Sequence, residues 1–235
     1  MTRRTQKVIS PTGLANCGLL FPAAPETDHR PKLAKCALIG HTETMAATPS
    51  TMVELGLKAP DFHLPSVADG RMVSLSDFAS SQALLVMFIC RHCPYVLHVK
   101  PELARLAADY KRKNVGILGI SSNDAQHYPD DGPERLVELS LDLDVPVLYD
   151  ESQAVAKTYR AACTPDFFLF DEERRLVYRG QLDDSRPGNS LPLTGRDLRS
   201  AIDAVLSGKS VPTEQRASIG CNIKWKPGNE PDYFR

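Results

Sequence analysis

The stretch ALLVMFICRHCP (83–94) places two cysteines directly after an apolar run. The run ALLVMFI (83–89) has the length and composition of a buried strand. The residues behind the cysteines predict a helix, because apolar side chains recur there every three or four positions. These apolar positions are Val96, Val99, Leu103, Leu106 and Tyr110. The two cysteines therefore lie where a strand gives way to a helix.

Cys90 and Cys93 form a CxxC pair at this junction. A thiol at the start of a helix faces unpaired backbone N–H groups and the positive end of the peptide dipoles, and both favour the thiolate. Such cysteines have a lowered pKa and react readily. The alternative is that Cys90 ends the strand as an inert, small apolar residue. The spacing and the position favour a redox-active dithiol.

Composition argues against several classes of function. The 28 basic residues nearly balance the 29 acidic ones, so nucleic acid is not an expected partner. The longest apolar run is far shorter than the roughly 20 residues that cross a bilayer. Structural zinc needs four ligands and the chain has no second CxxC, so no metal is expected. No phosphate-binding glycine motif occurs either, so no cofactor is expected.

Three regions differ along the chain. Residues 1–50 carry six Lys or Arg against three acids and show no sustained period, so we expect a disordered extension or a start assigned too early. Residues 51–210 are the expected domain, and residues 211–235 are a tail expected to pack on it. The first region has no secretory apolar segment, so we expect a cytoplasmic protein; an organelle is the alternative if residues 1–45 are a transit peptide.

The rest of the domain alternates between strand and helix patterns. Asp69-Gly70 is a turn dipeptide between two short alternating segments and predicts a hairpin. The last helix is expected to begin near Thr194, with Asp197 at capping-box spacing, and to stop at Gly208. Other strands are expected at 115–121, 147–149, 167–170 and 176–179, and other helices at 134–143 and 152–159. This order predicts an α/β protein whose mixed central sheet has helices on both faces.

Two segments carry a resemblance to a known fold. CRHCP (90–94) and CTPDFFLFD (163–171) resemble the two active-site segments of thioredoxin-fold proteins, and the likeness covers roughly residues 52–210. The opening LGLKAPDFHLP (55–65) and the tail CNIKWKPGNEPDYF (221–234) resemble the peroxiredoxin-like, AhpC/TSA-type branch. The resemblance implies a thioredoxin-like fold with an N-terminal hairpin and an inserted helical segment.

The resemblance also implies a substrate site and a reaction. In thioredoxin-like proteins the proline matching Pro165 is cis, and the residue matching Thr164 presents backbone groups to an incoming strand. We therefore expect a thiol–disulfide oxidoreductase that acts on thiols and disulfides of proteins or small molecules. Cys90, at an exposed position, attacks the partner's disulfide, and Cys93 resolves the mixed disulfide. A protonated His92 would favour the Cys90 thiolate.

Two other functions remain in view. The first is an antioxidant thiol peroxidase that attacks peroxide with Cys93. Peroxiredoxins, however, have Thr or Ser three positions earlier and Pro seven earlier, where this chain has Cys90 and Val86. Their activating arginine falls on or beside Pro165. The second is copper binding by the CxxC with His92 or His98, because soft thiolates suit Cu(I).

Three further features stay open at this level. Cys163 is either a third redox thiol or a buried packing residue. Cys221 is either a distant resolving cysteine, as in the tails of some peroxiredoxins, or a packing residue of the tail. Asp183-Asp184, with Arg186 and Asn189, resembles a loop of the same branch but by itself indicates only a polar turn.

Overall fold

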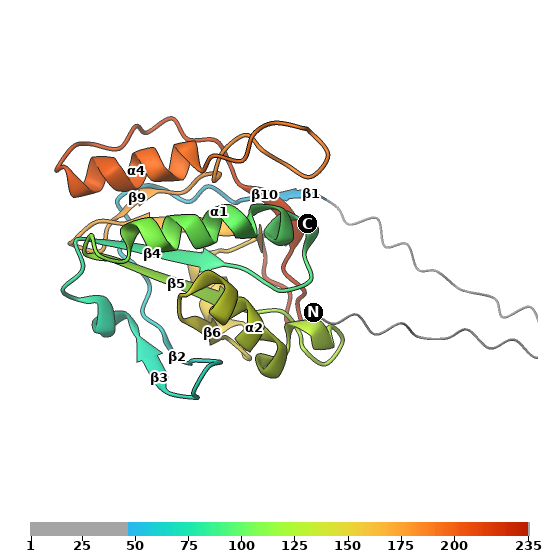
Figure 1. Ribbon diagram of the computed structural model, residues 1–235. Helices are drawn as coiled ribbons and strands as arrows, with labels where there is room; N and C mark the ends of the chain where they lie inside the picture. Colours follow the sequence, from blue (N-terminus) through green and yellow to red (C-terminus); the bar gives the residue numbers. More distant parts are fainter. Residues whose placement is uncertain (1–46, 235) are drawn as a thin grey trace, which may run out of the picture. The chain divides into compact units, whose positions relative to one another are not determined.

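A five-stranded mixed sheet forms the centre of the molecule (Figure 1). The computed structural model describes residues 47–234. The central strand β4 (Ala83–Phe88) pairs in parallel with β5 (Val115–Ser121) and antiparallel with β8 (Asp166–Phe170). The outer strands are β6 (Val147–Tyr149), parallel to β5, and β9 (Leu176–Tyr178), antiparallel to β8. This is the mixed sheet that the sequence predicts.

Strand β4 is buried along its whole length because both faces of the sheet are covered. Side chains along a strand alternate between the two faces. Leu85 and Met87 pack into one apolar cluster, whereas Val86 and Phe88 pack into the other. An apolar run without alternation at this point therefore reflects two cores, one on each side of the same strand.

Helices cover both faces of the sheet. α1 (Pro94–Tyr110), α2 (Pro133–Leu143) and α4 (Arg196–Leu206) contribute to the cluster around Leu85, and α3 (Ala154–Tyr159) contributes to the opposite cluster. The five apolar residues that predicted α1 are all buried. The expected helix positions are thus confirmed, with shifts of one or two residues at their ends.

Two further strand groups complete the described part of the chain. The expected hairpin is present as β2 (His63–Pro65) and β3 (Met72–Ser74), joined through Gly70 at a φ of 71°. Single 3-10 turns lie at η1 (Leu75–Phe78) and η2 (Pro129–Asp131).

None of the described helices is long and apolar enough to cross a membrane.

A separate three-stranded sheet has the order β1-β10-β7, and the sequence patterns did not predict it. β1 (Ala47–Pro49) and β7 (Cys163–Thr164) pair antiparallel with the two edges of β10 (Ile219–Asn222). The disorder expected for residues 1–46 lies outside the described residues. Residues 47–49, which belong to the same region expected to be disordered, form β1. This small sheet joins the tail region to the segment just before Pro165.

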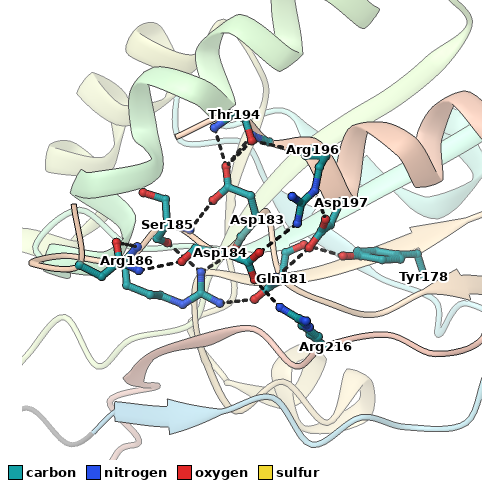
Figure 2. A network of polar contacts seen from close by, with 12 residues as sticks. Tyr178, Gln181, Asp183, Asp184, Ser185, Arg186, Thr194, Arg196, Asp197 and Arg216 are labelled. Carbon is teal, nitrogen blue, oxygen red and sulfur yellow. Dashed lines mark hydrogen bonds and ion pairs between the residues drawn. The ribbon is translucent and has the colours of Figure 1, made fainter. Parts of the chain in front are cut away.

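The helix α4 does not begin with the capping box that the sequence predicts. Its N-cap is Gly195, at a φ of 65°, with no side-chain cap of its own. The carboxylate of Asp183 instead accepts hydrogen bonds from the backbone N–H groups of Thr194 and Gly195, both at 2.6 Å (Figure 2). The carbonyl of Leu182 accepts from the N–H groups of Asp197 and Leu198 in the first turn, at 3.2 and 3.3 Å. Two residues distant in sequence thus satisfy the donors at the start of α4.

Asp184 connects the same loop to two other segments. Its carboxylate contacts Arg196 at 3.0 Å and Arg216 at 2.8 Å, and it accepts a hydrogen bond from Gln181 (Figure 2). Gln181 and these arginines lower the pKa of Asp184 to about 2. The pair that indicated only a polar turn is therefore a tertiary connection between α4 and the tail.

A buried ion pair lies beneath the small sheet. Nη2 of Arg179 is 3.1 Å from Oδ2 of Asp166, and both side chains are fully buried. Nε of Arg179 donates to the hydroxyl of Ser50 at 2.8 Å, and the guanidinium lies over the ring of Phe168. Burial raises the pKa of Asp166, and Arg179 opposes that rise.

We predict that Arg179→Met lowers the free energy of unfolding by about 3 kcal/mol at neutral pH, because it leaves a buried, unpaired carboxylate. The loss should shrink in acid, since the raised pKa of Asp166 allows the orphaned group to become neutral. Urea unfolding across pH measures this. The matched control is Lys100→Ala, which breaks the exposed pair with Asp142 and should cost less than about 1 kcal/mol. An equal decrease in the free energy of unfolding in the two variants would contradict the stabilising role of the buried ion pair.

Candidate active site

The CxxC segment forms the turn between β4 and α1. Cys93 is the N-cap of α1, and Pro94 occupies the first helical position, where its missing N–H costs nothing. The first helical hydrogen bond runs from the N–H of Leu97 to the carbonyl of Cys93 at 2.9 Å. The sulfur of Cys93 therefore lies at the positive end of a 17-residue helix.

Both thiols are buried, so the predicted exposure of Cys90 is wrong. Cys90 is 1% exposed and Cys93 is 0% exposed. The cover comes from Thr164: its hydroxyl lies 3.2 Å from the sulfur of Cys90, and its carbonyl oxygen lies 3.1 Å from the sulfur of Cys93. The bond between Thr164 and Pro165 is cis, as the resemblance implied.

A third sulfur completes the site. Sγ of Cys221 lies 2.8 Å from Sγ of Cys93, although 128 positions separate the two residues. Cys221 is in β10, directly opposite Thr164 in the antiparallel register. The thiols of Cys90 and Cys93 are close enough to shift each other's pKa. Cys90, Cys93 and Cys221, called here the three-thiol cluster, are thus gathered around one sulfur atom.

The cluster concentrates negative charge on Cys93. Contacts from the thiols of Cys221 and Cys90, with help from the backbone N–H of Val96, lower the pKa of Cys93 far below that of a free thiol. The carbonyl of Thr164 opposes this effect, because it can accept a hydrogen bond only from the protonated thiol. We assign the thiolate to Cys93, because the pKa of this thiol is lowered while those of Cys90 and Cys221 are raised, and because its sulfur lies at the positive end of α1.

The two neighbouring thiols hold their protons. Burial and the contact with Cys93 raise the pKa of Cys90, and the contact with Cys93 and burial raise the pKa of Cys221. The pKa shifts favour a thiolate on the second cysteine of the CxxC pair and a neutral thiol on the first. The catalytic roles of the two cysteines stay a prediction.

An acidic residue missed by the sequence analysis supports the CxxC turn. Asp131, in η2, is fully buried and accepts a hydrogen bond from the backbone N–H of Arg91 at 2.7 Å. Its other oxygen lies 2.5 Å from Nδ1 of His92 and accepts from the amide of Asn123 at 2.7 Å. The ring N–H of His92 is not aligned for a hydrogen bond, so its contact with Asp131 is an ion pair.

This arrangement favours a protonated His92. The adjacent Asp131 carboxylate raises the pKa of His92, and burial only partly opposes it. Burial alone would raise the pKa of Asp131, but His92 and Asn123 together lower it. The ligand atom of His92 lies within 4.8 Å of the sulfur of Cys90. The effect of His92 on the Cys90 thiol stays a prediction.

Three donors in this region approach the geometry of a metal site. The ligand atoms of Cys90, His92 and Asp131 all lie within 4.8 Å of one another. Asp131 already accepts bonds from Arg91 and Asn123, however, and so has little capacity left for a cation. His98, the other histidine considered for copper, contacts the hydroxyl of Ser185 at 2.8 Å.

The remaining predicted residues have distinct surroundings. Cys163 is fully buried with its thiol 3.5 Å from the carbonyl of Pro165, and burial raises its pKa. These are the properties of a packing residue. The edge of Thr164, where we expected a substrate strand to dock, is paired with β10. Docking of substrate there stays a prediction and requires β10 to move.

We predict that the reduced protein retains a thiolate in mildly acidic solution and that Cys93→Ser removes it, because the negative charge resides on that sulfur. The ultraviolet absorbance of thiolate, followed through a pH titration, measures this. Cys163→Ala is the matched control, since it deletes an equally buried thiol outside the cluster, and should leave the titration unchanged. If the thiolate absorbance in mildly acidic solution were lost in Cys90→Ser but not in Cys93→Ser, the thiolate would belong to Cys90, as the sequence predicts.

We also predict that Asp131→Asn lowers the pKa of His92, because it removes the carboxylate that favours the imidazolium. NMR titration of the His92 ring measures this. The pair stabilises the wild type fully below about pH 6.5, and the benefit is lost as the pH rises through the folded-state pKa of His92. Urea unfolding should therefore show that the difference in free energy of unfolding between the wild type and Asp131→Asn becomes smaller at alkaline pH. The exposed Asp130 serves as control, and Asp130→Asn should leave His92 nearly unaffected.

The sequence profile of the Redoxin family matches residues 54–195 of this chain. A protein named Peroxiredoxin 2, from Picrophilus torridus, is 24% identical over 181 residues, which are 76% of this chain and 85% of that protein. The crystal structure of an uncharacterized conserved protein from Geobacillus kaustophilus is 54% identical, with a TM-score of 0.76 over 78% of this chain and 98% of that one.

The fold is shared more widely. The thioredoxin domain of a thiol-disulfide oxidoreductase from Bacteroides vulgatus has a TM-score of 0.51 at 22% identity and covers 66% of this chain and 99% of that domain. At this identity the likeness concerns the fold alone. The Redoxin match spans more than half of the chain and includes Cys90, Cys93 and the Thr164–Pro165 segment. The chain therefore belongs to the Redoxin family of thiol-dependent oxidoreductases and has a thioredoxin-like fold.

Proposed function

We propose that this protein is a thiol–disulfide oxidoreductase in which Cys93 is the attacking thiolate and Cys90 the resolving thiol. The observation that carries the proposal is the position of Cys93, at the N-cap of α1 with the sulfur of Cys221 2.8 Å from its own and a pKa that both neighbouring thiols lower. The thiolate is the nucleophile in disulfide exchange. Because the pKa of Cys90 is raised while that of Cys93 is lowered, Cys93 is the better starting nucleophile.

The reaction conserves electrons at each step. The Cys93 thiolate attacks a disulfide R–S–S–R′, forms a mixed disulfide with R and releases R′ as a thiolate. Cys90 then gives up its proton and attacks the sulfur of Cys93, which forms the Cys90–Cys93 disulfide and releases R as a thiol. Two electrons pass from the dithiol to the substrate, and an external dithiol reductant must return them.

His92 assists the second step. The negative charge of Asp131 raises the pKa of Cys90, and a protonated His92, within 4.8 Å of the Cys90 sulfur and in contact with Asp131, offsets that charge when Cys90 must form a thiolate to resolve the intermediate. The substrates we propose are disulfides of proteins or small molecules. Since Cys93 is fully buried, they gain access only when a covering segment moves. We propose a cytoplasmic location, because a reducing compartment keeps such a pair in the dithiol form.

Peroxide reduction is the second candidate. The thiolate on Cys93 favours it, because this is the position of the peroxide-attacking cysteine in peroxiredoxins. Cys93 would then become a sulfenic acid with release of water or an alcohol, and Cys90 would condense with it to a disulfide. Against it, the contacts of Cys93 among residues 47–234 are thiols and a carbonyl group rather than a guanidinium. An absent positioned donor typically lowers such rates by about 100-fold or more.

Parallel assays with an insulin disulfide and with hydrogen peroxide separate the two candidates. We predict disulfide reduction by the wild type and a loss of at least about 100-fold in Cys93→Ser. The mixed disulfide should accumulate in the double variant Cys90→Ser/Cys221→Ser, because neither thiol beside Cys93 remains to resolve it. Cys163→Ala should behave as wild type. Rapid turnover of peroxide without turnover of disulfides would favour the peroxidase and overturn the proposal. Stoichiometric Cu(I) binding that requires both CxxC thiols, with neither turnover, would favour copper binding.

A further inference from the structure

The strand β10 is held over the three-thiol cluster by contacts on both sides of Cys221. Before it, the hydroxyl of Ser218 donates to the carbonyl of Pro165 at 2.7 Å. After it, the N–H of Lys224 donates to Oδ1 of Asn123 at 2.9 Å, and the amide of Gln153 donates to the carbonyl of Lys224 at 2.9 Å. Ser218, Asn123 and Gln153 are themselves buried. The position of Cys221 is therefore specified by buried polar contacts and not by apolar packing alone.

Gly220 allows β10 to approach closely. A Cβ atom at this position would lie 2.0 Å from the carbonyl oxygen of Thr164 and 2.6 Å from its carbonyl carbon. Because backbone atoms of β7 cannot withdraw as a flexible side chain could, only glycine permits this approach. The same approach brings the adjacent Cys221 to 2.8 Å from Cys93.

The Redoxin match ends at residue 195, so β10 and its cysteine lie beyond the part of the chain that defines the family. The sulfur of Cys221 lies 2.8 Å from the one sulfur of the three-thiol cluster that has a lowered pKa. A disulfide needs the two sulfur atoms to approach to about 2.05 Å, which is a small movement from the observed contact.

We propose that Cys221 is a second resolving thiol and that β10 is a covalent latch, closed when Cys93 and Cys221 are joined as a disulfide. The inference rests on the proposed function, because it requires a mixed disulfide on Cys93. In the latched state the strand β10 is bonded over the site and the edge of Thr164 is closed. In the reduced state only hydrogen bonds and packing hold the strand, and its departure exposes Cys93 to substrate.

The latch closes and opens by exchange alone. When Cys93 is bonded to a substrate sulfur, Cys221 loses its proton and attacks the sulfur of Cys93; the bond to the substrate breaks and the substrate leaves as a thiol. Cys90 then loses its proton and attacks the sulfur of Cys93. This step breaks the Cys93–Cys221 bond, forms the Cys90–Cys93 disulfide and returns a proton to Cys221. The second step transfers no electrons out of the cluster.

Disulfide mapping of variants that each lack one cysteine tests the pairing of Cys93 with Cys221. Each reduced variant is oxidised with diamide, alkylated, digested without reductant and analysed by mass spectrometry. We expect a Cys93–Cys221 disulfide in Cys90→Ser and a Cys90–Cys93 disulfide in Cys221→Ser. The matched control is Cys163→Ala, in which both pairings should remain available. The alanine substitutions Cys90→Ala and Cys221→Ala repeat the test if a serine variant fails to fold.

A second measurement tests the strand while both thiols of the proposed Cys93–Cys221 pair stay intact. Gly220→Ala in the Cys90→Ser background should slow formation of the Cys93–Cys221 disulfide by about 100-fold, because a displacement of an ångström misaligns the sulfurs. In the reduced protein it should also speed alkylation of Cys93. Ile219→Ala, which alters an exposed side chain of the same strand, is the control and should change neither rate.

Failure of the latch is distinguishable from failure of the proposed function. If Cys93 and Cys221 both stay free in oxidised Cys90→Ser and Cys90→Ala, while the wild type still reduces disulfides through Cys90 and Cys93, the latch is wrong and the oxidoreductase stands. If Cys93→Ser retains disulfide reduction, the proposed function itself is wrong. Equal rates in Gly220→Ala and Ile219→Ala would also overturn the latch, because the close approach of β10 would then have no part in the pairing.

Discussion

The close pairing of β10 with β7 is the constraint on which the rest of the site depends. β7 has only two residues, Cys163 and Thr164, and leads directly into Pro165. Because Gly220 carries no side chain, β10 can approach the carbonyl of Thr164 and place Cys221 opposite it in register. That single pairing covers the CxxC turn, brings in the third sulfur and joins the tail region to the rest of the domain.

The distribution of charge follows from this geometry. A thiolate buried without partners would be strongly unfavourable, yet Cys93 is at once buried, at the positive end of α1 and in contact with two protonated thiols. Cys90 is equally buried but lies in the turn after β4, away from the start of α1, and burial together with the nearby Cys93 and Asp131 raises its pKa. The helix terminus and these neighbours thus give opposite pKa shifts to two cysteines of the same turn.

Much of the fold could be predicted because its elements have strong local signals. The apolar run of β4 and the three-to-four spacing along α1 need no tertiary information, and both are confirmed. The cis bond before Pro165 came from the resemblance of the segment CTPDFFLFD and not from local chemistry. The cap of α4 shows the limit of local rules, because Asp183, eleven positions before Thr194, replaced the predicted capping box.

The parts of the site that could not be predicted are those set by contacts between distant segments. β7 and β10 have two and four residues, too few to produce a periodic pattern, and their pairing joins segments more than fifty positions apart. Asp131 reaches the CxxC turn from a 3-10 turn forty positions away, in a sequence where it reads as an ordinary acidic loop residue. Cys90 is buried against Thr164, which lies 74 positions further along the chain, so its exposure was wrongly inferred from its position in the sequence alone.

Amide hydrogen exchange of the reduced protein tests the central constraint most directly, because it reports the β10–β7 pairing residue by residue. The account predicts that the amides of Cys221 and of its neighbours in β10 are protected far beyond those of an unpaired tail, and that Gly220→Ala removes this protection while the amides of β4 and β5 keep theirs. Exchange of the β10 amides at the rate of an unstructured peptide in the wild-type protein would contradict the account.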